Sequence, residues 1–295
     1  MKKNFLKTLL CICLMTVGMC GCGNAGENTS ARTDQEEQKN DNDFTENSSK
    51  ESSIITGDIN ESNAEKEGVC GADIKWYYQK NILVIRGTGE MDNYTSTWGK
   101  QPWEASGFRS EIQEIYIEDG VESIGDFAFS ECTGLTRIDI PDSVGYIGDF
   151  AFSDCRNLTS VDIPDGVGYL GDSAFSLCSS LSSVNIPDSI FSIGESTFLQ
   201  CYRLTDITIP DSVDYIADSA FSGCHDLSSI NIPDSVTSIG EHAFELCKNL
   251  TDISIPDSVT SIGKMAFYSC DDLKVTYQGQ EYTSENDPYG WWHSK

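Results

Sequence analysis

The chain has 295 residues, with 47 acidic and 19 basic side chains and a formal charge of −28. A charge of this size repels the phosphates of nucleic acids and anionic lipid headgroups. The length allows one or two domains with a sizeable core. We therefore expect no nucleic-acid partner, and contact with a membrane only through an attached anchor.

Residues 1–21 have the pattern of a signal peptide. Three lysines among the first seven residues precede an apolar run, residues 9–19, that is too short to span a bilayer as a helix. The run ends at Gly21-Cys22, which resembles a bacterial lipoprotein signal. This resemblance implies a covalent lipid anchor on Cys22 and an extracytoplasmic, membrane-anchored protein on the cell surface. An ordinary cleaved secretion signal is the alternative.

Residues 22–68 carry no helical or strand periodicity. From residue 23 onward this segment holds twelve acids, four bases and one aromatic side chain, Phe44. So little apolar surface cannot offset the entropy lost on ordering. The composition therefore predicts a disordered acidic spacer.

Residues 69–111 are expected to form a small β-rich cap. Two apolar runs, 74–78 and 82–85, flank a short polar segment and predict a hairpin. Trp98 and Trp103 follow, and these large side chains are suited to cover the end of the segment that begins at residue 112.

Residues 112–277 repeat with a period of 23. A phenylalanine recurs at this interval, preceded by Ala in six of seven cases and followed three positions later by Cys and six positions later by Leu. The phenylalanines are Phe129, Phe152, Phe175, Phe198, Phe221, Phe244 and Phe267. After each of the first six leucines, alternating aliphatic residues predict a short strand that the following Pro-Asp ends, and the last unit departs from this register. The Gly-Asp before the next Ala-Phe predicts a short helical turn.

One such unit cannot bury its apolar side chains alone, whereas stacked units cover one another. The Ile-Gly-x-x-Ala-Phe, Cys-x-x-Leu and Ile-Pro frame resembles the BspA-like family of leucine-rich-repeat bacterial surface proteins. The resemblance covers residues 112–277 and implies an α/β solenoid of parallel strands and short helical turns, preceded by the cap. Residues 278–295, with Trp291 and Trp292, are expected to cover the other end or to form an exposed aromatic contact.

Seven of the twelve cysteines belong to the repeat and occupy one inward-facing column. We expect free structural thiols there, with disulfides between neighbouring coils as the alternative. One cysteine per coil does not suit a zinc site, which needs closely spaced pairs. No nucleophile, metalloprotease or phosphate-loop motif is present, and His225, His242 and His293 lie in none. We therefore expect no catalysis, no metal and no cofactor other than the covalent lipid.

Two exposed rows are candidate partner-binding surfaces. The first is the outward strand position: Asp139, Asp162, Asn185, Thr208 and Asn231. Leucine-rich-repeat proteins commonly hold partners on this concave face, so the resemblance implies a binding role, and solubilisation is the alternative. The second row is Tyr146, Tyr169 and Tyr215, which suit stacking on sugars or protein side chains, or shielding of the next coil. Turn aspartates from Asp142 to Asp257 are expected to form turns, with a divalent-cation row as the alternative.

These features predict a monomeric cell-surface leucine-rich-repeat protein that mediates protein recognition or adhesion without catalysis. Its expected partner is an extracellular or host-surface protein. A glycan-binding accessory surface protein is the alternative.

Overall fold

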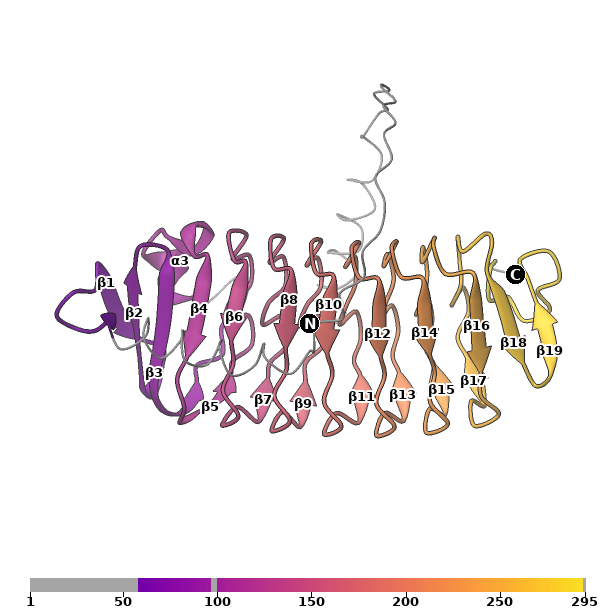
Figure 1. Ribbon diagram of the computed structural model, residues 1–295, viewed down its shortest axis with the longest axis horizontal. Coiled ribbons are helices and arrows are strands. Elements are labelled where there is room, and N and C mark those ends of the chain that lie inside the picture. Colours follow the sequence, from indigo (N-terminus) through magenta and orange to yellow (C-terminus); the bar gives the residue numbers. More distant parts are fainter. Residues whose placement is uncertain (1–57, 97–99, 294–295) are drawn as a thin grey trace, which may run out of the picture. The chain divides into compact units, whose positions relative to one another are not determined.

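The computed structural model describes residues 58–96 and 100–293 (Figure 1). The expected signal peptide, Cys22, Trp98 and most of the expected spacer lie outside these ranges. None of the helices within them has the length and apolar composition that a membrane span requires.

The repeat forms a solenoid in which each coil contributes two short strands (Figure 1). The first row consists of β4 (Glu114–Ile117), β6 (Arg137–Asp139), β8 (Ser160–Asp162), β10 (Ser183–Asn185), β12 (Asp206–Thr208), β14 (Ser229–Asn231), β16 (Asp252–Ile255) and β18 (Lys274–Tyr277). The second row consists of β5 (Val121–Ile124), β7 (Tyr146–Ile147), β9 (Tyr169–Leu170), β11 (Ser192–Ile193), β13 (Tyr215–Ile216), β15 (Ser238–Ile239) and β17 (Ser261–Ile262). Paired strands within each row are parallel, which confirms the predicted solenoid of parallel strands.

The core is a set of columns, each built from one position of the repeat. The seven phenylalanines are fully buried, and consecutive rings stack with centroids 5.2–5.9 Å apart. The repeat cysteines form a second buried column, and all seven are free. Each thiol from Cys155 onward donates a hydrogen bond to the carbonyl of the phenylalanine 26 positions earlier, as Cys201 does to Phe175 at 3.2 Å. The prediction of free inward-facing thiols is confirmed.

The predicted helical turns are absent from the coils that the structure describes. In each coil two positions adopt left-handed backbone angles, for example Phe150 (φ 57°) and Asp154 (φ 64°), which interrupt a right-handed helix. The N–H groups of Phe150, Phe152 and Asp154 donate to carbonyls of the next coil. The N–H groups of the residues between them, Ala151 and Ser153, donate to the carbonyls three residues earlier and so close turns. The segment that was expected to be helical thus forms turns whose alternate N–H groups bond to the next coil. The fold is therefore a β-solenoid.

Where an aspartate holds the expected helix-start position of the coil, it acts between coils instead, as at Asp126, Asp149, Asp172 and Asp218. Asp149 Oδ1 accepts the N–H of Asp172, 23 residues later, at 3.1 Å. Asp172 Oδ1 accepts the N–H of Glu195 in the same way at 2.9 Å. This bond explains the aspartate at the position, because its short carboxylate reaches the backbone of the next coil.

The N-terminal cap contains the predicted hairpin. β2 (Gly71–Gln79) and β3 (Ile82–Met91) are antiparallel, and Lys80 and Asn81 both have positive φ, as a two-residue hairpin turn requires. β3 then pairs in parallel with β4 and with β5, so one long strand begins both rows. The helix α3 (Pro102–Ala105) and the 3₁₀ turn η1 (Arg109–Glu111) also belong to this cap.

Trp103 closes the N-terminal end of the core. It is fully buried and stacks on Phe129, with ring centroids 5.2 Å apart. The cap begins earlier than its predicted boundary at residue 69, because β1 (Lys66–Val69) pairs with β2. Ile59 is also buried, against Val84 and Tyr116. The polar residues 58–68 are ordered by the pairing of β1 with β2 and by a few apolar contacts. Amino-acid composition alone reveals neither the pairing nor the contacts.

The C-terminal tail takes the place of a further coil. β19 (Gln280–Tyr282) pairs with β18 in antiparallel orientation. The N–H of Phe267 donates to the carbonyl of Trp291, as earlier phenylalanines donate to the next coil. Trp291 and Trp292 are buried, and the Trp292 indole donates to the carbonyl of Cys270 at 3.1 Å. The two tryptophans therefore cover the core, and the alternative of an exposed contact is wrong for them.

Candidate functional site

The predicted binding row lies on the outer surface of the first strand row, which we call the sheet face. Asp162, Asn185, Thr208 and Asn231 are exposed, and Asp139 is half-buried. Strand register places Asp162 opposite Asn185 and Thr208 opposite Asn231. The Asn185 amide donates to Asp162 Oδ1 at 3.1 Å. The structure thus brings these polar side chains together in neighbouring pairs along one surface.

The N-terminal end of the sheet face is covered. Tyr116 lies opposite Asp139 in the strand register, yet it is buried under a small apolar cluster with Ile59, Tyr77 and Val84. The guanidinium of Arg137 lies over the Tyr116 ring, 5.6 Å from its centroid. The exposed part of the face therefore starts at β6. The sequence signal for this cover was the pair of outward apolar residues Val84 and Tyr116 on the neighbouring strands β3 and β4, and the cover was not predicted.

Two shallow depressions hollow the exposed sheet face. The larger, of about 700 Å³, crosses β12, β14, β16 and β18, and its outward side chains are Asp206, Thr208, Ser229, Asn231, Asp252, Ser254 and Thr276. The smaller, of about 360 Å³, crosses β8, β10 and β12.

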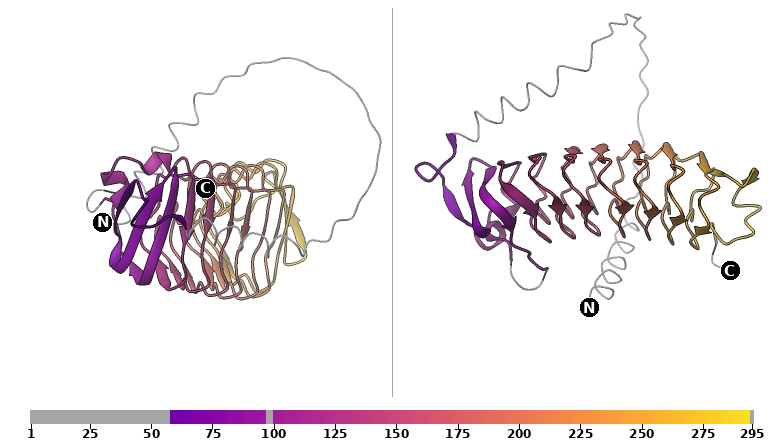
Figure 2. Two further views of the ribbon diagram at one scale, coloured as in Figure 1. Left: turned by 60° about the vertical axis from the view of Figure 1, so that its left-hand side comes forward. Right: turned by 90° about the horizontal axis from the view of Figure 1, so that it is seen from below.

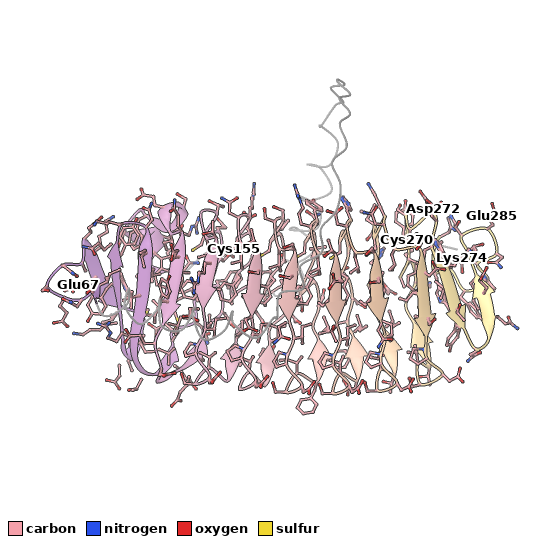
Figure 3. The ribbon with its side chains drawn as sticks, in the orientation of Figure 1. Glu67, Cys155, Cys270, Asp272, Lys274 and Glu285 are labelled. Carbon is pink, nitrogen blue, oxygen red and sulfur yellow. The ribbon has the colours of Figure 1, made fainter. Side chains whose placement is uncertain are left out.

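The larger depression offers hydroxyl, amide and carboxylate groups over a floor of isoleucines. Its two carboxylates, Asp206 and Asp252, lie two strands apart, and Lys274 stands opposite Asp252 in the strand register. Figure 3 labels Lys274 near the C-terminal end of the row. The surface can therefore donate and accept hydrogen bonds over several strands while favouring cationic groups.

The second predicted row lies along β7, β9 and β13. The rings of Tyr146 and Tyr169 stack with centroids 4.8 Å apart and planes 6° apart. Tyr169 is 44% exposed and Tyr215 is 42% exposed. Ser192 occupies the position between those two, so the row is interrupted. Tyr169 donates to Asp149 Oδ1 at 3.4 Å, and burial raises the pKa of its hydroxyl well above the usual range.

The described cysteines and histidines show no arrangement for nucleophilic chemistry. Burial raises the pKa of Cys70 and of Cys270 to about 12, so their thiolates do not form near neutral pH. His225 stacks on Tyr202, and burial lowers its pKa. His242 lies 3.0 Å from Glu245, whose carboxylate raises the histidine pKa. Among the described residues, no three metal-ligating side chains form a cluster.

Comparison with known proteins assigns the repeat. A family model described as "BspA type Leucine rich repeat region" matches residues 107–227 and 191–284, in six copies. No curated protein matches the chain.

Several solved bacterial structures are similar to the chain. One is a leucine-rich cell surface protein from Faecalibacterium prausnitzii A2-165, with 25% identity, a TM-score of 0.47, and coverage of 73% of this chain and 77% of that one. Another is a leucine-rich repeat protein from Bacteroides ovatus ATCC 8483, with 25% identity, a TM-score of 0.45 and 70% of each chain covered. A third, from Eubacterium ventriosum ATCC 27560, has 22% identity, a TM-score of 0.41 and 72% coverage of each chain.

Proposed function

Because the chain belongs to the BspA-type leucine-rich-repeat family, we propose that it is a bacterial cell-surface protein that recognises or adheres to another protein. The observation that carries this proposal is the exposed sheet face between β6 and β18. It presents polar side chains at regular strand spacing, over a core that the repeat itself holds rigid. A rigid, extended surface suits a macromolecular partner, because many modest contacts form without ordering loops.

The larger depression is the proposed centre of this contact. Thr208, Ser229 and Asn231 lie between the carboxylates of Asp206 and Asp252. These groups pair with hydrogen-bond donors and positive charges of a partner. The partner is therefore an extracellular or host-surface protein with a basic or amide-rich contact surface.

The remaining parts of the proposal follow from the sequence. We propose that Cys22 carries a covalent lipid, that residues 22–57 separate the solenoid from the membrane, and that the protein is a monomer. We propose a binding role without catalysis, and the burial of every described thiol supports it, because buried thiols are not available as nucleophiles. A glycan-binding accessory role is the second candidate, and the exposed rings of Tyr169 and Tyr215 favour it.

Binding of the full chain to a panel of extracellular proteins and to a glycan array tests the proposal. The triple variant Asp206→Ala/Asn231→Ala/Asp252→Ala should weaken protein binding at least about tenfold, because it removes three polar contacts from the depression. Glu285→Ala is the matched control, since Glu285 is exposed near β19 (Figure 3). Unchanged protein binding by the triple variant contradicts the assignment of the sheet face. Glycan binding that depends on the tyrosines would favour the second candidate.

A further inference from the structure

The carboxylates of the exposed sheet face recur on every second strand. From β8 to β16, the charged or amide residues that point outward are Asp162, Asn185, Asp206, Asn231 and Asp252, one on each strand, and all five are exposed. Asp206 and Asp252 hold the same position of their coils, with β14 between them. Two strand spacings of about 4.8 Å therefore place these two carboxylates roughly 10 Å apart.

The backbone pairing of the first strand row has the same period of two coils. β8 pairs with β10, β12 with β14, and β16 with β18, and the three pairs belong to separate sheets. The first strand of each pair carries one of the three carboxylates. The two depressions of the sheet face cross all three pairs and meet at β12 (Figure 1). The exposed face is therefore a shallow track of repeated units, each roughly 10 Å long.

Hydrogen-bonding groups without partners lie along this track. Ser229 and Asn231 are exposed on β14, and neither side chain makes a hydrogen bond within the described ranges. Asp252 has no ion-pair partner there either. Asp206 accepts the hydroxyl of Thr205 on Oδ2 at 3.3 Å, which leaves Oδ1 open. The track thus alternates free acceptors of negative charge with free neutral donors.

Given the function proposed for the sheet face, on which this inference rests, we propose that the track binds an extended polyproline-II segment of the partner with a basic residue at every third position. A polyproline-II helix rises about 3.1 Å per residue with three residues per turn, so every third side chain points the same way at about 9.3 Å. This repeat matches the separation of Asp206 and Asp252. Its backbone carbonyls have no internal partners, so they accept hydrogen bonds from Ser229 and Asn231.

Other backbone conformations match the track less well. A β-strand repeats the side chains of one face at about 6.8 Å, which is too short for carboxylates on every second strand. An α-helix brings every seventh residue to one face at about 10.5 Å, but its carbonyls are bonded within the helix. Ser229 and Asn231 would then lose water without gaining an acceptor.

Basic side chains mark both ends of the track. Arg137 lies on β6, before Asp162, and Lys274 lies on β18, opposite Asp252. Because both repel a further cation, the bound segment spans β8 to β16, four strand spacings or roughly 19 Å. Three basic residues at every third position span about 18.6 Å. Asp162 lies two residues further along its strand than Asp206 does on β12, so the segment crosses the strands obliquely at this end.

A charge-neutral swap tests the spacing of the carboxylates. Asp206→Ser/Ser229→Asp moves one carboxylate from β12 to β14, because the two residues are opposite each other in the strand register. The net charge and the composition of the chain stay the same. Asp226→Asn/Asn249→Asp is the matched control, since it moves a carboxylate by one coil outside the depressions. Asp252→Asn removes a carboxylate with little change of shape and serves as a second variant.

Isothermal titration calorimetry of the full chain at about 0.15 M salt measures the binding. The probes are N-acetyl-(Arg-Pro-Pro)4-amide, N-acetyl-(Arg-Arg-Pro-Pro-Pro-Pro)2-amide, which has the same composition, and an alanine-based helical peptide with four arginines at every seventh position. The first peptide should bind with a dissociation constant on the order of 0.1–1 mM, at least about fivefold tighter than the other two. The Asp206→Ser/Ser229→Asp swap should weaken it at least about fivefold, and Asp252→Asn at least about threefold. The control swap should leave it within about twofold.

Three results would overturn the inference. They are the lack of saturable binding of the first peptide, equal or tighter binding of either other peptide, and unchanged affinity in both the Asp206→Ser/Ser229→Asp swap and Asp252→Asn. Thermal unfolding of each variant at the temperature of the parent chain serves as the folding control. If any of these results accompanies protein binding that the triple variant of the sheet face weakens, the inference fails and the proposed function stands.

Discussion

Truncation of one ring in the phenylalanine column should cost far more than truncation of an exposed ring in the same coil. Phe198 is fully buried, and its ring stacks on Phe175 at 5.9 Å and on Phe221 at 5.5 Å. Phe198→Ala removes the buried ring and leaves a cavity between two coils, which costs about 3–5 kcal/mol of unfolding free energy. Phe191→Ala removes a ring that is 67% exposed, and should change stability by less than about 0.5 kcal/mol.

Urea unfolding of the full chain, followed by far-UV circular dichroism, measures both variants. Because long repeat arrays can lose cooperativity, amide hydrogen exchange should accompany it. We expect faster exchange in the coils on both sides of Phe198, since each coil contacts only its neighbours. A loss below about 1 kcal/mol for Phe198→Ala, or an equal loss for Phe191→Ala, would refute the view that the stacked column holds the coils together.

Three further predictions concern the buried thiols, the bond from Asp172 to the next coil, and the pair formed by His242 and Glu245. The eight cysteines of the described ranges should react with a thiol reagent at neutral pH only when the chain unfolds, because all are buried; rapid native-state labelling at those positions would contradict this. Asp172→Ala should lower the free energy of unfolding in urea by about 1.5–3 kcal/mol, because the N–H of Glu195 loses a charged acceptor. Asp172→Asn keeps a neutral acceptor and should lower it by roughly half as much. Equal losses of stability in the two variants would argue against the hydrogen bond. Glu245 raises the pKa of His242, so the stability that this pair contributes is fully present below about pH 6.5 and is lost as the pH rises through the pKa of the folded state. Glu245→Gln should therefore flatten the pH dependence of the unfolding midpoint in this range. An unchanged pH profile would speak against the pair.

The solenoid could be predicted from the sequence because the apolar residues that recur every 23 positions are the ones that become buried. Each inward position recurs every 23 residues, and the structure buries nearly all of them, so pattern and packing carry the same information. The helical turn was wrong because i to i−3 spacing is shared by helices and by consecutive turns. What separates the two is the left-handed backbone at positions such as Phe150 and Asp154, and neither residue type signals it.

The extent of the cap was also beyond sequence pattern. Residues 58–68 are mostly polar, and their order comes from pairing of β1 with β2 and from Ile59 packing on Tyr116. Backbone hydrogen bonds leave little trace in composition, because almost any residue can form them. The Trp291 and Trp292 cover was left open for a related reason, since their burial depends on how the tail folds back over the last coil.

The distinction between folding and recognition in this chain follows from which positions the repeat constrains. Inward positions are nearly invariant from coil to coil, because each must match the coil on either side, so they leave no freedom for specific binding. Exposed positions are free to differ, and the candidate sites lie where they do. Ser192 interrupts the tyrosine row, and Asp206 and Asp252 flank neutral groups on the sheet face. A partner that binds this protein specifically must therefore contact the exposed positions that differ between coils, because the inward positions are nearly the same in every coil.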